Sequence, residues 1–408
     1  MNQQDSWRTL SDNAHRTITF LNKKAIVHAE AFFTSGQSTE VTIRNSEILT
    51  KNRVDDLGVG FRVVSKGNKV GFACTNAIGK EEVLAAGETA FNIAKISSAT
   101  PDFALPSAGK LPVVNGLFDP RVAEINVEEV VDIAERASRA TEDFDKRVVA
   151  KDGGAFFQVE HVGIMNTLGV DVEEERTHAI AYIGASGEQN SEVTSSCYEV
   201  MYRRALELNP ELVGQNAARK VVRLFEPKSL ESFEGTVVFS PEAVSYQLVT
   251  VMLNALKGDN VVARRSLWGE RIGEQVASSK LTVEDDALFE GGFSARSFDD
   301  EGCPSKKTTL LKNGELKGFL HYATSANALA VEDTGNASRF PGGFDMIQLI
   351  IGKGYRAKPE VYSSNLTIQP GSKTTEELLA EVDKGVLIES MAGFPQAGSG
   401  IISAQLSR

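Results

Sequence analysis

The stretch PEAVSYQLVTVMLNALKGD, residues 241–259, is the most informative segment of the sequence. Its apolar residues recur at the spacing of one helical face, and such a face packs on a core. These residues are Val244, Leu248, Val251, Met252 and Ala255. Periodicity alone therefore predicts a packed helix here.

Strand-like segments surround this helix. Residues 235–240, GTVVFS, predict a strand that leads into it. Downstream, Asn313-Gly314 favours the positive φ angles of a two-residue hairpin turn. A late helix is expected from Thr374, because Thr374 and Glu377 fit a capping box, and Lys384-Gly385 fits its end.

The first half of the chain mixes helices with strands. Periodicity and cap residues predict helices over residues 11–29, 81–96, 127–141 and 211–224. Strands are predicted over residues 57–65, 70–76 and, in alternating fashion, 147–205. Prolines between residues 97 and 115 predict an irregular connection.

These patterns predict an α+β fold in two parts. The first is an N-terminal α/β domain, residues 1–225, with two subregions joined near residues 97–115. The second is a C-terminal domain, residues 226–408, with a mostly antiparallel, barrel-like β-sheet crossed by a helix. The whole chain has 408 residues, which is too many for one ordinary hydrophobic core.

Composition excludes several classes of protein. Acidic residues outnumber basic ones, 55 to 43, and this negative balance disfavours nucleic-acid binding. No apolar run approaches the roughly 18 residues of a membrane span. The N-terminus lacks a signal-peptide pattern, and the three isolated cysteines suit reduced thiols, so a cytoplasmic location is expected.

The stretch 241–259 also resembles the helix that carries His-Glu-x-x-x-His in the TldD half of the TldD/PmbA peptidase family, also called peptidase U62 or "modulator of DNA gyrase". The flanking Pro-Glu-Ala and Leu-x-Gly-Asp match. However, the two histidines fall on Val249 and Asn254, and the glutamate falls on Thr250. Valine and threonine supply neither the imidazole nor the general-base carboxylate of a zinc peptidase. The resemblance therefore indicates the PmbA/TldE-like branch, with no metal site and no cofactor in this chain.

Three further segments carry the same resemblance. Residues 298–318 resemble the family's Asp-Glu-Gly-x-Pro turn and hairpin, residues 334–339 its Thr-Gly-Asn-x-x-Arg segment, and residues 56–76 its first-domain hairpin. Cys303 departs from the family, which often has an aliphatic residue there. The chain stops at Arg408, within what resembles the closing β region, and the sequence leaves open whether this C-terminus is native or truncated.

Two of these segments supply the candidate substrate contacts. Turn glycines allow close backbone approach, and the neighbouring charged or amide groups can hold a peptide main chain or terminus. The candidates are Asp299, Glu301, Gly302, Thr334, Gly335, Asn336 and Arg339. Arg339 is the candidate anion contact, since a guanidinium grips carboxylates bidentately. The alternatives are a structural ion pair for Arg339 and solvated or capping carboxylates for the acidic turn.

A weaker catalytic alternative pairs Cys303 with His321. A nearby imidazole lowers a thiol pKa and activates the nucleophile. No third orienting group is identifiable in the sequence, so a catalytic role for these two residues is the less favoured interpretation.

The resemblance implies the function of the chain. Family members dimerise, and paired TldD and TldE chains form a zinc peptidase with one active site in an internal cavity, which takes unfolded or short peptides. This chain is expected to be the metal-free subunit, with zinc in a His-Glu-x-x-x-His partner. The alternatives are a homodimeric hydrolase or transferase, possibly dependent on Cys303, and a non-catalytic peptide-binding module.

Overall fold

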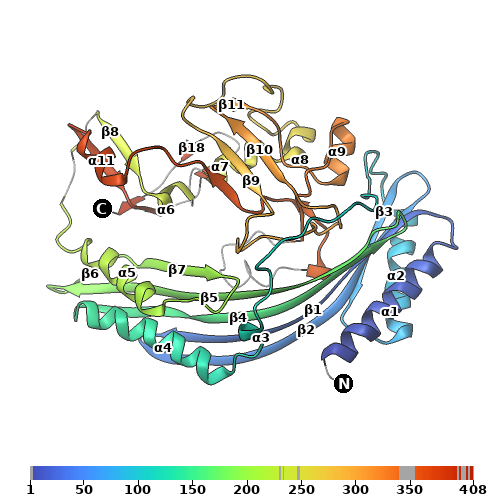
Figure 1. Cartoon of the computed structure of the whole chain (residues 1–408), viewed down its shortest axis with the longest axis horizontal. Helices are drawn as coiled ribbons and strands as arrows, with labels where there is room; N and C mark the ends of the chain where they lie inside the picture. Colours follow the sequence, from blue (N-terminus) through green and yellow to red (C-terminus); the bar gives the residue numbers. More distant parts are fainter. Residues whose placement is uncertain are drawn as a thin grey trace.

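Figure 1 shows the computed structural model of the chain. It describes residues 3–228, 231–232, 234–245, 249–339, 354–392, 395–396, 401–402 and 405–407. Within the predicted helix at 241–259, residues 246–248 lie outside these ranges. Arg408, where the sequence leaves open a native or a truncated end, also lies outside these ranges.

A curled antiparallel sheet forms the body of the N-terminal part (Figure 1). Four of its strands are 19 residues long: β1 (Ile26–Arg44), β2 (Glu47–Ser65), β4 (Val148–Asn166) and β5 (Asp171–Gln189). The strand order is β3-β2-β1-β4-β5-β6, with β7 also paired to β5. The short strands are β3 (Lys69–Thr75), β6 (Glu192–Val193) and β7 (Cys197–Arg203).

Two pairs of helices cover one face of this sheet. They are α1 (Gln3–Leu21) with α2 (Lys80–Ile96), and α4 (Val127–Phe144) with α5 (Pro210–Val222). A one-turn helix, α3 (Pro120–Ala123), precedes α4. Odd-numbered residues of β1 point to this face, so Phe33 packs with α1 and α2, and Val41 packs with α4 and α5. The helices predicted at 81–96, 127–141 and 211–224 are therefore confirmed.

The first predicted helix is misplaced. Residues 11–29 were expected to be helical from a cap at Ser11, but α1 spans residues 3–21 and β1 begins at Ile26. The apolar face of α1 starts at Trp7 and Leu10, ahead of the supposed cap. Asn13 lies inside the helix, where its side-chain amide donates to the Ile78 carbonyl at 2.8 Å. Tertiary packing thus uses a residue type that usually marks a helix start.

The C-terminal part lies over the other, concave face of the sheet (Figure 1). Phe298 and Tyr355 pack there against Phe32 and Ile164 of the sheet. A four-stranded antiparallel sheet, in the order β11-β10-β9-β14, carries its core. These strands are β9 (Val283–Asp286), β10 (Lys307–Lys312), β11 (Glu315–Leu316) and β14 (Leu366–Ile368).

Short elements complete this part. The helices are α6 (Pro241–Ala243), α7 (Val249–Leu256), α8 (Gly258–Val262), α9 (Ala323–Leu329), η2 (Gly354–Arg356) and α11 (Thr375–Ala380). The strands are β8 (Thr236–Phe239), β12 (Ala337–Ser338), β13 (Glu360–Val361), β15 (Gly385–Ile388), β16 (Ser390–Ala392), β17 (Pro395–Gln396), β18 (Ile401–Ile402) and β19 (Gln405–Ser407).

Local signals located two of these elements. Asn313 and Gly314 have φ angles of 51° and 76°, which confirms the predicted hairpin between β10 and β11. Thr374 and Glu377 form the predicted capping box of α11. That helix ends at Ala380 and not at Lys384, because residues 385–388 pair in parallel with β8.

The α+β prediction is confirmed. Helices and strands are mixed along the chain, and a curled antiparallel sheet forms its largest element. None of the helices in the described ranges combines the length and apolar character that a membrane crossing requires.

Candidate functional site

The residues that the resemblance assigns to the zinc motif of the TldD helix lie on α7. Val249 opens this helix, and the Asn254 side-chain amide donates to the Thr250 carbonyl at 2.9 Å. Valine has no ligand atom, and an amide engaged with its own helix is a poor zinc ligand. The donor set on α7 therefore does not fit zinc.

The Asp299 carboxylate accepts the hydrogen bonds that hold the acidic turn, residues 299–304, in its shape. It is fully buried, and it accepts hydrogen bonds from the backbone N–H groups of Glu301 and Cys303 at 2.9 Å each. Its second oxygen accepts from the Ala337 N–H at 2.8 Å. Burial, reinforced by nearby Asp333, raises the pKa of Asp299 to about 7. The two segments singled out in the sequence thus meet, and Asp299 joins them.

Glu301 is also fully buried and is not a solvated carboxylate. It lies 2.7 Å from the Arg62 guanidinium of β2, and it accepts the Ala323 N–H at 3.1 Å, at the start of α9. Burial raises the pKa of Glu301 to about 7, although Arg62 opposes this shift and the neighbouring Glu30 adds to it. Glu301 therefore connects the turn to the sheet and to α9.

Arg339 is buried, with 2% exposure. Its guanidinium donates to the Asp300 carbonyl at 3.2 Å and to the Ala357 carbonyl at 2.6 Å, and it pairs with Glu30 of β1. These partners correspond to the structural ion pair that the sequence left open. The geometry gives no support to Arg339 as a substrate anion contact, and that role stays a prediction.

The remaining candidates hold loops together. Thr334 accepts the His321 N–H at 2.6 Å, and the Asn336 amide donates to Asp285 at 2.7 Å. Gly302 and Gly335 have φ angles of 84° and 71°, which explains why glycine occupies both turns. Their part in peptide binding also stays a prediction.

The weaker alternative, a pairing of Cys303 with His321, gains no support from the contacts of the described residues and stays a prediction. No contact within the described ranges joins the two side chains; the Cys303 thiol lies beside Asp299 and Asp333, and His321 Nδ1 lies 3.2 Å from Ser325 Oγ. Burial, together with these carboxylates, raises the pKa of the Cys303 thiol. Burial lowers the pKa of His321 to about 4. A neutral thiol without a base is a poor nucleophile.

One set of metal-capable donors went unnoticed in the sequence. Oxygen atoms of Asp299 and Asp333 and the sulfur of Cys303 lie within 4.8 Å of one another. Both Asp299 oxygens already accept backbone hydrogen bonds. Asp333 escaped notice because it lies outside the segments that matched the family pattern.

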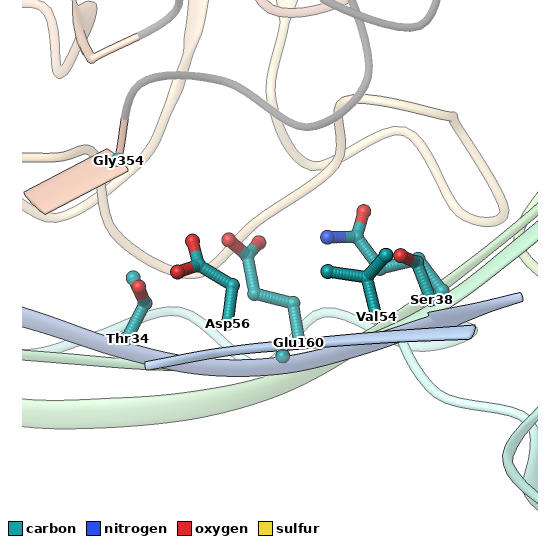
Figure 2. A pocket seen from close by; sticks show the side chains of 8 residues that line it. Thr34, Ser38, Val54, Asp56, Glu160 and Gly354 are labelled. Carbon is teal, nitrogen blue, oxygen red and sulfur yellow. The ribbon is translucent and has the colours of Figure 1, made fainter. Parts of the chain in front are cut away.

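A small pocket of about 40 Å³ lies on the concave face of the sheet. Its lining residues are Thr34, Gly36, Ser38, Val54, Asp56, Gln158, Glu160 and Gly354. Figure 2 shows the Asp56 and Glu160 carboxyl groups pointing from the sheet into the same space. Three strands and η2 supply this lining, and no local sequence motif marked it.

The two carboxylates of this pocket differ in their surroundings. Arg356 holds Asp56 with two hydrogen bonds, of 2.7 and 2.5 Å, and the Tyr355 hydroxyl donates at 3.2 Å. These contacts lower the pKa of Asp56 against the opposing effect of burial. Burial raises the pKa of Glu160, with Arg176 acting against it.

A second, larger pocket of about 650 Å³ lies under α1 on the helix-covered face. Trp7 stacks on His161 with 3.6 Å between ring centroids, and its indole N–H donates to Glu173 at 3.3 Å. Burial lowers the pKa of His161, although Glu175 and Glu173 act in the opposite direction.

The curled sheet, with a β-rich part on its concave face, defines a class of metallopeptidase-like chains. Three segments match the domain models of this class: "PmbA/TldA metallopeptidase domain 1" over residues 29–94, the central domain over 120–225, and the C-terminal domain over 232–408. The chain belongs to the TldD/PmbA family.

Individual relatives are consistent with this family. A metalloprotease of Methanocaldococcus jannaschii is 26% identical over 92% of this chain and 80% of its own length. The metalloprotease PmbA of Escherichia coli O157:H7 is 24% identical over 83% of this chain and 75% of its own length. The crystal structure of TldE from Thermococcus kodakarensis has the same fold, with a TM-score of 0.83, 24% identity, and coverage of 93% of this chain and 83% of that one.

Proposed function

We propose that this chain is the metal-free subunit of a TldD/TldE-type zinc peptidase that acts on unfolded or short peptides. The observation that carries the proposal is the donor set on α7. Val249 and Asn254 occupy the positions of zinc-binding histidines, and Thr250 occupies that of the general base. Since a zinc peptidase requires both functions, a partner chain with His-Glu-x-x-x-His would supply metal, base and water.

The relatives support this proposal at a general level. Several are named metalloproteases, and the fold is that of a TldE protein. The shared fold with a changed α7 fits a subunit that keeps the architecture without the metal chemistry.

The chain also offers surfaces for a partner and for an extended peptide. β3 lies at one edge of the sheet, and β6 and β7 pair with β5 at the other. A strand edge can pair with an added strand through main-chain hydrogen bonds. On α7, only Ala255 and Leu256 are buried, while the apolar side chains of Met252 and Leu253 remain partly exposed. A partner chain could cover this apolar surface.

The cysteine-dependent homodimeric enzyme is the weaker proposal. Burial raises the pKa of the Cys303 thiol, and His321 Nδ1 lies 3.2 Å from Ser325 Oγ, so nothing in these contacts activates the thiol. A non-catalytic peptide-binding module differs from the subunit proposal only in lacking a catalytic partner, so the same experiment separates them.

The test is to co-express this chain with a His-Glu-x-x-x-His relative from the same genome. We expect a stable two-chain complex, zinc in the partner only, and casein hydrolysis that a chelator abolishes. The chain alone should hydrolyse nothing. As a matched control, replacing the partner's motif glutamate with glutamine should stop hydrolysis while the complex still forms.

Two outcomes contradict the proposal. Chelator-resistant hydrolysis by this chain alone, lost in Cys303→Ala, would establish the cysteine enzyme. Peptide binding without formation of any active complex would establish the binding module.

A further inference from the structure

The floor of the larger pocket, under α1, is built by one row of residues across three strands. Ser35 of β1 pairs with His161 of β4, and His161 pairs with Glu175 of β5. All three side chains point to the helix-covered face and line the pocket of about 650 Å³. The register of the strands thus places a hydroxyl, an imidazole and a carboxylate side by side at its base.

The charges around this pocket are mainly negative. Its lining includes the carboxylates of Asp12 on α1 and of Glu173 and Glu175 on β5. Within the described ranges, the basic group near these glutamates is His161, which lies 3.6 Å from Glu173 and 3.8 Å from Glu175. Burial lowers the pKa of His161, so its imidazole is largely neutral at about pH 7 and does not compensate the two charges. Arg8 also lines the pocket, but it forms no ion pair with any residue that the structure describes.

The Ser35 hydroxyl distinguishes this pocket from a solvated acidic surface. Ser35 is 4% exposed and lines the pocket, and its side chain has no hydrogen-bond partner among the described residues. Removing a hydroxyl from water without giving it a partner costs free energy. The position therefore favours a ligand that reaches the floor and donates a hydrogen bond there.

Two aromatic rings hold the wall of the pocket in place. Trp7 is 7% exposed, and its ring lies 3.6 Å from that of His161, on which it stacks, and 5.0 Å from that of Phe33. The Trp7 indole N–H donates to Glu173 at 3.3 Å. These contacts orient Glu173 and the imidazole before a ligand arrives, and such preorganisation reduces the entropy that binding costs.

We propose that this pocket binds a basic peptide segment, whose lysine or arginine side chain pairs with Glu173 and Glu175 and whose N–H groups reach the Ser35 hydroxyl. Ammonium and guanidinium groups carry only N–H donors, and carboxylates supply acceptors for them. The opposite charges make these hydrogen bonds charge-assisted. The volume of about 650 Å³ lies within the range of ligand pockets and admits a long side chain with part of the backbone that carries it.

The pocket lies on the helix-covered face of the sheet, whereas the C-terminal part, with the candidate substrate contacts, packs on the concave face. A basic segment bound here is therefore held away from those contacts. The proposal takes only its ligand class, a peptide, from the proposed function. It is tested on the single chain without zinc or a partner, so either proposal can fail while the other stands.

Binding can be measured on the purified full chain by saturation-transfer NMR with three blocked amino acids. N-acetyl-lysine amide carries an ammonium group, N-acetyl-arginine amide carries a guanidinium group, and N-acetyl-glutamine amide carries neither. We expect millimolar binding of at least one cationic probe, and roughly fivefold weaker binding of the glutamine probe. Added salt should weaken binding of the cationic probes, because both glutamates are partly exposed and therefore screened. The cationic probe that binds more tightly identifies the side chain.

Two variants and a control locate the site. Glu175→Gln removes one charge and leaves the contact between Trp7 and Glu173 in place, so the cationic probes should bind roughly threefold more weakly. Ser35→Val replaces the hydroxyl with a side chain that suits a strand and fills the floor, and it should weaken binding by about threefold or more. Asp143→Asn is the matched control, because it also removes one exposed negative charge but lies on α4, outside the pocket lining. Thermal unfolding of all three variants checks that they are folded.

The proposal is overturned if neither cationic probe binds at millimolar concentration, or if the glutamine probe binds as tightly as both. It is also overturned if folded Glu175→Gln binds the cationic probes as the wild type does, or if Asp143→Asn weakens binding equally, which would reveal a nonspecific effect of net charge. Unchanged affinity in folded Ser35→Val would show that no ligand reaches the floor and would likewise reject the site. If Ser35→Val does not fold, the comparison of Glu175→Gln with Asp143→Asn decides.

Discussion

Arg62 of β2 and Glu301 of the acidic turn face each other at 2.7 Å in the interior, with 3% and 0% of their side chains exposed. Arg62 also pairs with Glu30, and Glu30 pairs with Arg339. Charges of alternating sign thus run from the turn through the sheet and back into the C-terminal part. This arrangement joins segments that are more than 200 residues apart in the sequence.

Breaking this buried series of ion pairs should lower the free energy of unfolding. Arg62→Met removes the cation between two buried carboxylates and leaves Glu30 and Glu301 without it, so we expect the free energy of unfolding to fall by about 3 kcal/mol. Urea denaturation followed by circular dichroism measures the change. The surface pair Lys24–Glu88, at 2.8 Å and with 31% and 43% of its side chains exposed, is the control, and Lys24→Met should cost less than about 1 kcal/mol. Equal effects of the two substitutions would contradict a special role for the buried pair.

A second prediction concerns pH and Asp333. Burial raises the pKa of Asp333 from 3.8 to about 6. The folded state therefore favours the protonated carboxyl, whose stabilising contribution is complete below about pH 4 and is lost as pH rises through about 6. Asp333→Asn mimics the protonated form and can keep the acceptor for the Gly335 N–H. The unfolding free energy of Asp333→Asn minus that of the wild type should therefore increase by about 2 kcal/mol as the pH rises from about 4 to about 8.

The check is urea denaturation of both proteins at the two pH values. Asp143→Asn is the control, because Asp143 is exposed on α4 and pairs only with Lys146 at the surface. A gap between wild type and Asp333→Asn that stays constant with pH, or that widens toward acid, would contradict the predicted direction.

A third prediction tests the hairpin glycine. Gly314 has a φ of 76°, and a Cβ there would lie 2.2 Å from the Gln275 amide nitrogen and 2.3 Å from the Ala277 carbonyl oxygen. Gly314→Ala should therefore lower the free energy of unfolding by about 2 kcal/mol or more. Gly318→Ala is the control, since nothing lies within 4 Å of its Cβ position. Similar melting temperatures for both variants would show that the turn tolerates a side chain.

Local signals predicted the features that local physics determines. The Asn313-Gly314 turn and the capping box at Thr374 were visible because neighbouring residues alone create them. The first helix was misplaced because burial of Asn13 depends on a carbonyl 65 residues away. Strand β1 was missed because its residues are buried on both faces over much of their length, which removes the alternation that marks a strand.

The candidate sites show the same division. The resemblance brought together Asp299 and the 334–339 segment, and the structure joins them through the Ala337 N–H. The burial of Arg339 depends on Glu30, which is 309 residues away. The small pocket on the concave face depends on the register that sets Gly36 between Asp56 and Glu160. No single-sequence pattern predicts such a register across three strands.

The last prediction concerns the reactivity of the cysteines. Cys303 is buried, and burial with two adjacent carboxylates raises its thiol pKa, whereas Cys74 is exposed on β3. Alkylation requires a thiolate and access to it. In native protein at about pH 8, iodoacetamide should therefore label Cys74 at least about tenfold faster than Cys303, as measured by peptide mass spectrometry. Labelling in urea, where all three cysteines react, provides the control. Rapid native labelling of Cys303 that His321→Ala slows would mean that the thiol is activated after all, and it would revive the cysteine enzyme over the metal-free subunit.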